Sequence, residues 1–316
     1  MEYWIIGGVL FIVLAVLIIS YICFRMAFYA PRKESLSKEV FKLPDGEIYE
    51  KHRDLMIGWM KEVREIPYEE IKIKSFDGLE LYGKYYECDK NAPIELMFHG
   101  YRGSAETDLC GGVKRCFSLG FNVLLVDQRT SGKSGGKVIS FGVNESRDCM
   151  SWIEYLSKRF GEDAKIILTG ISMGASTVMM ATKYQLPKIV VGVIADCGYT
   201  SPKEIIKTVI KQMKLPPNLA YPFVKLGAKI YGKFNLEESS PIEALKTCKV
   251  PVLFFHGDTD DYVPCEMSRI NYEACNSKKW LVTIPNAGHG LAYVVDEEKY
   301  LNALKEFYNY ILSDKE

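Results

Sequence analysis

The chain has 316 residues, of which 48% are hydrophobic and 25% charged, a composition typical of a globular protein. Its 40 basic and 40 acidic residues give a formal net charge of zero, which argues against a nucleic-acid-binding protein. The nine cysteines are scattered without a CxxC pair, which argues against a zinc site or a disulfide scaffold and favours a reducing compartment.

The first element is an uncharged stretch from Tyr3 to Phe24. As a helix it would span roughly 33 Å, enough to cross a bilayer. A cleaved signal peptide fits less well, because Glu2 stands where a basic region belongs and the apolar stretch is long. We therefore expect residues 1–30 to form a retained transmembrane anchor. The positive-inside rule places the rest of the chain in the cytoplasm, because basic residues follow the span, namely Arg25, Arg32, Lys33 and Lys38.

Residues 31–66 are charged and carry a helical apolar stripe, made by Leu55, Met56, Trp59 and Val63. We predict a helical linker that packs on the main domain, residues 67–316. That domain opens with two runs of alternating polarity, Ile71–Ser75 and Leu79–Glu87, on either side of an Asp-Gly pair. This pattern predicts a β-hairpin.

Short apolar runs then alternate with helical segments. Strands are predicted at Ile94–Phe98, Asn122–Val126, Ile166–Thr169, Ile189–Ala195, Val252–Phe255 and Leu281–Ile284. Helices are predicted at Asp108–Leu119, Ser146–Phe160, Ser176–Tyr184 and Glu297–Leu312. Together with the hairpin, this order predicts an α/β fold with a mostly parallel eight-stranded sheet flanked by helices. In such sheets, functional groups gather at the carboxyl ends of the strands.

The alternation stops between Tyr199 and Cys248. Two amphipathic helices, separated by Pro216-Pro217, are predicted there above the strand ends. A long insertion at this place is typical of a lid, and we expect a helical lid at about residues 200–247.

The strand at Ile166–Thr169 leads into Gly170-Ile171-Ser172-Met173-Gly174. A Gly-x-Ser-x-Gly pattern between a strand and a helix predicts a serine held on a sharp, strained turn. Glycine suits both flanking positions, because a side chain there would crowd the turn. The helix N-terminus would present free N–H groups to a developing oxyanion, so Ser172 is the candidate nucleophile.

A serine hydroxyl needs a base, and the chain has four histidines. His289 lies in a loop of small residues after the last predicted strand, which suits a base aimed at Ser172. His99 and His256 end apolar strands and could also act as bases, although a structural role at a strand end suits them better. His52 lies in the charged linker and is expected to be solvated.

The base needs an orienting acid, and three aspartates follow the strand at Val252–Phe255. Asp260 is the candidate acid, whereas Asp258 and Asp261 are expected to form hydrogen bonds within the turn. Asp196, after an earlier strand, is the alternative.

An oxyanion needs two backbone donors. The N–H of Met173, just after the nucleophile, is the first candidate. The second is the N–H of Tyr101, in the loop after the strand at Ile94–Phe98. The neighbouring Arg102 is either a substrate contact or an ordinary surface charge.

The motifs occur in a recognisable order. They are His99-Gly-Tyr-Arg-Gly, Asp127-Gln-Arg-Thr-Ser-Gly-Lys-Ser, Gly170-Ile-Ser-Met-Gly, His256-Gly-Asp-Thr-Asp-Asp-Tyr-Val-Pro and Gly288-His289. The chain resembles the α/β-hydrolase superfamily over about residues 67–312, and within it the membrane-anchored, serine-aminopeptidase-like branch. The resemblance implies Ser172 as nucleophile, Asp260 as acid and His289 as base, and it supports a lid. The extended Gly-Gly oxyanion motif of some lipases is missing from the sequence.

The functional hypothesis is a serine hydrolase that cleaves a carboxylic ester, acyl or lipid-like, through an acyl-enzyme intermediate. A carboxylesterase or lipase-like activity is favoured over a peptidase. The expected partners are a small-molecule substrate and a membrane, with no cofactor, metal or nucleic acid; the oligomeric state is left open. The alternatives are an aminopeptidase or other amide hydrolase, and a non-catalytic membrane-bound binding protein on a hydrolase fold.

Overall fold

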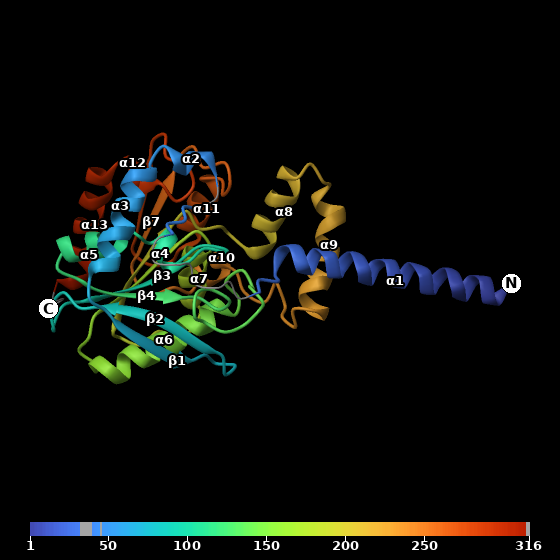
Figure 1. Cartoon of the computed structure of the whole chain (residues 1–316), viewed down its shortest axis with the longest axis horizontal. Coiled ribbons are helices and arrows are strands. Elements are labelled where there is room, and N and C mark those ends of the chain that lie inside the picture. The colour runs from blue at the N-terminus through green and yellow to red at the C-terminus, as the bar shows by residue number, and fades with distance from the viewer. Residues whose placement is uncertain (32–39, 45, 314–316) are drawn as a thin grey trace.

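The computed structural model describes residues 1–31, 40–44 and 46–313, and its core is one eight-stranded sheet (Figure 1). The strands are β1 (Glu69–Lys74), β2 (Glu80–Tyr86), β3 (Ile94–Phe98), β4 (Asn122–Asp127), β5 (Ile166–Ile171), β6 (Val190–Asp196), β7 (Val252–Gly257) and β8 (Lys279–Ile284). Their order in the sheet is β1-β2-β4-β3-β5-β6-β7-β8. The pairs β1–β2 and β2–β4 are antiparallel, and all other neighbours are parallel. The predicted mostly parallel sheet of eight strands is confirmed.

Helices of very different length accompany the sheet. They are α1 (Glu2–Ala27), α2 (Glu47–Glu50), α3 (Arg53–Glu65), α4 (Ala105–Asp108), α5 (Gly112–Ser118), α6 (Glu145–Phe160), α7 (Met173–Ala181), α8 (Pro202–Gln212), α9 (Pro217–Ile230), α10 (Pro241–Leu245), α11 (Glu266–Ala274), α12 (Ala292–Val295) and α13 (Glu297–Leu312).

Helices cover both faces of the sheet, which explains why the central strands are apolar throughout. On one face, side chains from β3, β4 and β5 pack against α6 and α7 in a single cluster that includes Leu96, Trp152 and Val178. On the other face, alternate residues of the same strands pack against α3, α5 and α13. The carboxyl ends of the parallel strands are therefore left for a site, as expected.

Two of the predicted helices differ from the sequence-based expectation by more than one residue. Helix α7 begins at Met173, earlier than the predicted Ser176, because the chain turns directly from β5 into the helix at Ser172. The single helix predicted at Asp108–Leu119 is two short helices, α4 and α5, and Gly111 between them packs against Trp59.

The linker contributes a helix to the domain. Residues 32–39 of the predicted linker, and with them Arg32, Lys33 and Lys38, lie outside the described residues. In α3 the buried face is Met56, Trp59, Met60 and Val63. Leu55, which the predicted stripe included, is instead 46% exposed, because its position on the helix turns it away from the domain.

Helix α1 projects from the domain and is, among the described residues, the one helix long and apolar enough to cross a membrane (Figure 1). Its C-terminal part packs across α9. The approach is close: a Cβ on Gly227 would lie 2.4 Å from the carbonyl oxygen of Ser20. The Tyr231 hydroxyl also donates to the carbonyl of Leu17 at 3.0 Å.

The insertion between β6 and β7 consists of two parts. Helix α9 packs on α1 and α8 packs on α9, at the end of the molecule from which α1 projects (Figure 1). Helix α10 instead packs on α7 and α11, with Leu245 in the main core. The outlying part is therefore the α8–α9 segment, Pro202–Ile230, which is shorter than the predicted residues 200–247.

Candidate active site

The turn between β5 and α7 holds Ser172 in a strained backbone conformation, with φ 56° and ψ −117°. Both flanking glycines are required there. A Cβ on Gly170 would lie 2.2 Å from the backbone of Gly174, and a Cβ on Gly174 would lie 2.0 Å from the carbonyl oxygen of Phe98. The Gly-x-Ser-x-Gly pattern thus forms the tight strand-to-helix turn that the sequence predicts.

Gly174→Ala is expected to destabilise the fold by about 3 kcal/mol or more, because β3 and α7 would have to separate. Gly58→Ala is the matched control. A Cβ at Gly58, inside α3, meets no atom within 4 Å, so alanine there should stabilise the helix by about 0.5–1 kcal/mol. Denaturant unfolding of the detergent-solubilised chain measures both. Equal stability of the two variants would refute the close packing of α7 against β3 at Gly174.

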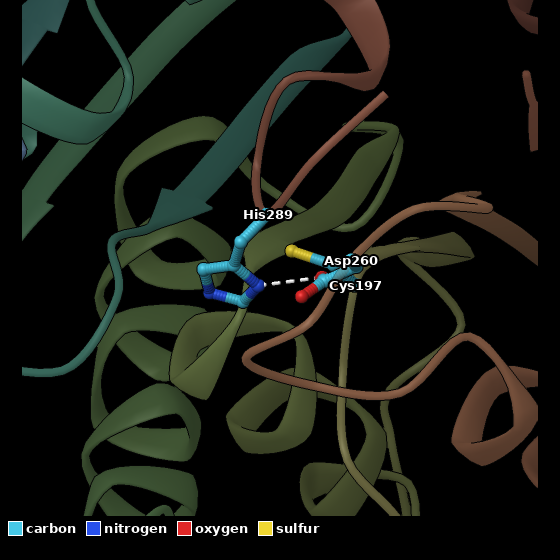
Figure 2. Close-up of side chains that lie close together, drawn as sticks. All are labelled: Cys197, Asp260 and His289. Atoms are coloured by element: carbon cyan, nitrogen blue, oxygen red, sulfur yellow. Dashed lines mark hydrogen bonds and ion pairs between the residues drawn. The ribbon is translucent and has the colours of Figure 1, made fainter. Parts of the chain in front are cut away.

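Ser172, His289 and Asp260 form a hydrogen-bonded chain. The Nε2 atom of His289 lies 2.9 Å from the Oγ atom of Ser172, and its Nδ1 atom lies 2.6 Å from Oδ2 of Asp260. Figure 2 shows the second of these contacts, with the His289 ring directed at the Asp260 carboxylate. Since a carboxylate only accepts, Nδ1 carries the proton and Nε2 is free to accept from the serine hydroxyl.

Asp260 is buried and held in its charged form. Its Oδ1 atom accepts the backbone N–H groups of Tyr262 and Val263, at 2.9 and 2.8 Å. Its Oδ2 atom faces His289 and, at 3.2 Å, Nε2 of His256. Burial alone would raise the pKa of Asp260, but hydrogen bonds from the two histidines lower it to about 2.

The two histidines that end strands, His99 and His256, serve the framework. Nε2 of His99 accepts the backbone N–H of Gln128 at 3.0 Å, which joins the ends of β3 and β4. Nε2 of His256 lies 2.8 Å from the carbonyl of Val263, and its Nδ1 lies 2.6 Å from Oγ of Ser268. Both residues therefore hold strand-end turns, and His256 in addition supports Asp260.

The alternative aspartates lie apart from the base. Asp258 accepts the backbone N–H of Asn286 at 2.7 Å, a turn hydrogen bond of the expected kind. Asp261 is exposed, and its backbone carbonyl accepts from Gln212. Asp196 accepts from the hydroxyl of Tyr300 at 3.1 Å. Of the four aspartates considered, Asp260 is the one hydrogen-bonded to His289.

The helix and the loop that carry the candidate oxyanion donors lie beside the serine. Met173 is the first residue of α7, where a helix leaves its N–H groups without intrahelical partners. The loop with Tyr101 begins at Gly100, and a Cβ there would be 3.8 Å from Oγ of Ser172. Asp108 holds this loop by accepting the Gly100 N–H at 2.8 Å.

The side chains of the same loop hold the end of α1. The Tyr101 hydroxyl donates to the carbonyl of Ala27 at 2.7 Å. The Arg102 guanidinium donates to the carbonyls of Met26 and Tyr29, at 2.8 and 3.1 Å. Arg102 is therefore an exposed charge that caps the C-terminus of α1, where cations are favoured. The sequence offers no local signal for this contact.

Three further residues at the site were not anticipated. The Tyr49 hydroxyl, from the linker, donates to the carbonyl of His289 at 2.9 Å. The ring of Tyr262 lies 5.1 Å from the His289 ring, between centroids. Cys197 is fully buried beside the His289–Asp260 pair (Figure 2).

Cys197, Asp260 and His289 could in principle hold a metal ion, since their ligand atoms lie within 4.8 Å of one another. The chemistry of the set argues against it. Burial raises the pKa of the Cys197 thiol well above its usual value, which disfavours the thiolate that metals bind. The His289 and Asp260 atoms in question are also already hydrogen-bonded to each other.

A family model supports the class that the fold and the site define. Residues 113–315 match the prolyl oligopeptidase family, and the chain belongs to that family of α/β hydrolases.

Two curated relatives are similar over most of their length. The chain is 30% identical to the protein YqkD of Bacillus subtilis over 60% of this chain and 62% of that protein, so it spans somewhat less than two thirds of YqkD. It is 28% identical to the protein bem46 of Schizosaccharomyces pombe, over 70% of this chain and 71% of bem46.

Solved structures share the fold. An esterase of Pyrococcus furiosus superposes with a TM-score of 0.66 at 22% identity, covering 91% of this chain and all of that one. An acylaminoacyl peptidase of Pyrococcus horikoshii superposes with a TM-score of 0.58 at 19% identity, over 81% of this chain and 44% of that one. Both an esterase and a peptidase thus use this architecture, and the chain belongs to the α/β hydrolases by fold and family.

Proposed function

We propose that the protein is a serine hydrolase that cleaves a carboxylic ester by acyl transfer. One observation carries the proposal: a serine on a strained turn, an imidazole and a buried carboxylate are joined by hydrogen bonds of 2.9 and 2.6 Å. In this reading Ser172 attacks the carbonyl and His289 takes its proton. Asp260 holds the imidazole in the required tautomer and stabilises the imidazolium that forms.

The remaining steps use the same groups. The backbone N–H groups of Met173 and Tyr101 would stabilise the oxyanion of the tetrahedral intermediate. His289 then returns its proton to the leaving alkoxide, which gives an acyl-Ser172 ester. Water, deprotonated by His289, attacks that ester and releases the acid and the free serine. No step in this sequence requires a cofactor.

An apolar acyl chain suits the surroundings of Ser172. Met173 belongs to one apolar cluster with Phe28 at the end of α1, with Ile206 of α8 and with Val224 of α9. The α8–α9 segment and α1 therefore border the site, which supports a lid function for this segment and a lipid-like ester as substrate. We further propose that α1 is the membrane anchor and that the domain lies on the cytoplasmic side.

Amide hydrolysis is the second candidate, and the family match favours it. The chain belongs to the prolyl oligopeptidase family, and the peptidase of Pyrococcus horikoshii shares its fold. The triad itself does not separate the two reactions, because attack on an ester and attack on an amide use the same groups.

A substrate series tests this choice. Purified wild type is given p-nitrophenyl esters of rising acyl length and, separately, aminoacyl and acylaminoacyl p-nitroanilides, with Ser172→Ala as the blank. We expect kcat/KM for the esters to exceed that for the amides and to rise with chain length. Higher kcat/KM for the anilides would overturn ester hydrolysis as the function and favour a peptidase.

A further inference from the structure

Helix α9 carries an apolar stripe on its outward side. Leu219, Phe223, Leu226 and Ile230 follow one another at helical spacing. Leu219 is 69% exposed, more than any other large apolar side chain that the structure describes beyond residues 1–27, and Ile230 is 42% exposed. The turn between α8 and α9 adds Met213 and Leu215, which are also exposed. A patch of this kind marks an interaction surface.

The stripe faces the direction in which α1 leaves the molecule. Gly227 of α9 touches α1, whereas the buried residues Tyr221, Val224 and Ala228 lie to one side of it on the helix. At about 100° per residue, Leu219 and Leu226 lie roughly a quarter turn to the other side of Gly227. Figure 1 shows α1 leaving the domain, passing α9 and continuing to the N-terminus, so the side of α9 away from the domain is the side towards which α1 runs.

The length of α1 beyond its contact with α9 determines where α9 lies relative to the membrane. The contact with α9 extends to Leu17, whose carbonyl accepts from Tyr231. Only residues 2–16 of α1 lie beyond that point, and they span about 22 Å. The hydrocarbon core of a bilayer is about 30 Å thick. If α1 crosses the membrane, the part that packs on α9 must therefore enter the membrane boundary, and α9 with it.

The charge of the segment suits an anionic lipid surface. Residues 202–233 contain seven lysines and one acidic residue, Glu204, although the whole chain has no net charge. Lys211, Lys214, Lys229 and Lys233 are exposed. An amphipathic helix with an apolar side and flanking lysines binds the interface of anionic bilayers.

We propose that the α8–α9 segment docks on the surface of the anionic membrane that α1 spans, with Leu219, Phe223, Leu226 and Ile230 inserted among the upper acyl chains. This rests on the proposed function and on α1 as its anchor, and it names the source of the substrate: an ester that reaches Ser172 from the bilayer. The buried side of the segment shares one apolar cluster with Met173, next to the serine, so the docked segment borders the site.

A lipid-quenching experiment tests the docking. An environment-sensitive fluorescent amino acid replaces Leu219 in the full-length chain, which is reconstituted in phosphatidylcholine vesicles with and without phosphatidylglycerol. Asn302, exposed on α13, is the control position. We expect a blue-shifted emission and quenching by brominated acyl chains at position 219 alone, stronger with the anionic lipid. Emission from position 219 that is not quenched by brominated lipid would overturn the proposal. So would a dimer that buries the stripe and that dissociates in Leu219→Asp.

An activity comparison separates this proposal from the proposed function. Leu219→Asp/Ile230→Asp should lower hydrolysis of a long-chain ester embedded in vesicles by at least about five-fold. Its hydrolysis of a soluble short-chain ester should stay at the wild-type value. Ile270→Asp, on α11, serves as the control for an exposed apolar residue and should change neither rate. Equal rates for the double variant and wild type on the embedded ester would refute docking. Turnover of the soluble ester would still support the proposed hydrolase function, so the two proposals can fail separately.

Discussion

Ser172→Ala is expected to remove ester hydrolysis, with a fall in kcat of about 10⁶-fold. Without the hydroxyl no acyl-enzyme forms, and what remains is the effect of binding and of the oxyanion donors. Stability should change little, because the Oγ atom of Ser172 contacts His289 and an alanine side chain fits the same space. The measurement is kcat on a short-chain p-nitrophenyl ester, together with the unfolding midpoint.

The matched control for that variant is Ser157→Ala. Ser157 lies on α6, away from the carboxyl ends of the strands, and should keep the wild-type rate. Turnover in Ser172→Ala within ten-fold of wild type would exclude the serine as nucleophile. A folded wild type without turnover on any ester or amide would instead favour a binding protein on this fold.

Asp260→Asn should lower kcat by about 10⁴-fold while the fold is retained. The asparagine side chain can present its N–H₂ group to Nδ1 of His289, which would favour the imidazole tautomer with its proton on Nε2. In that tautomer the ring cannot accept the proton of Ser172. The fall should appear in kcat more than in KM, because the substrate does not touch the buried carboxylate.

Asp258→Asn is the control for the choice of acid. Its Oδ1 atom accepts the N–H of Asn286, and an asparagine oxygen can do the same, so activity should stay within a few-fold of wild type. Full activity in Asp260→Asn would contradict the assignment, and a large fall in Asp196→Asn in its place would transfer the role to Asp196.

The pKa of Asp260 also determines the pH range in which its charge stabilises the fold. It is lowered from an ordinary 3.8 to about 2, because the hydrogen bonds from His256 and His289 outweigh burial. A carboxylate with a depressed pKa stabilises the fold above its unfolded pKa, and this contribution, about 2 kcal/mol, is lost as the pH falls from about 4 towards 2. Between pH 4 and 8 Asp260 stays ionised, so a change of rate in that range belongs to another group.

The turn at Ser172 could be predicted from the sequence because its requirements are local. A strand, a helix and a serine between two glycines occupy adjacent positions, and steric contact within the turn demands the glycines. The order of strands and helices can also be predicted from the sequence, because each strand of the parallel part is a separate apolar run. The places of His289 and Asp260 after strands predict that they meet Ser172, since parallel strands bring such loops to one edge.

Contacts between distant segments could not be predicted. Tyr49 reaches His289 from the linker, and the pattern around Tyr49 shows only a charged helical segment. Arg102 caps α1, although nothing near Arg102 indicates a helix end. His256 supports Asp260 through a side-chain contact that depends on how the loop after β7 folds back. Such pairings are set by tertiary packing.

The relation between α1 and the insertion is the largest difference from the sequence-based view. The sequence indicates an anchor and a lid as separate elements. In the structure Phe24 and Phe28 of the α1 end lie in the same apolar cluster as Ile206 and Val224 of the insertion. The site is thus bordered by the helix proposed to hold the protein at a membrane.

The central claim is that Ser172 is the nucleophile, and covalent labelling tests it most directly. Wild type and Ser172→Ala are treated with a fluorophosphonate probe, digested, and mapped by mass spectrometry. We predict one adduct per wild-type chain, on the peptide that contains Ser172, and none on the variant. An adduct on another residue, or labelling that persists in Ser172→Ala, would contradict the account.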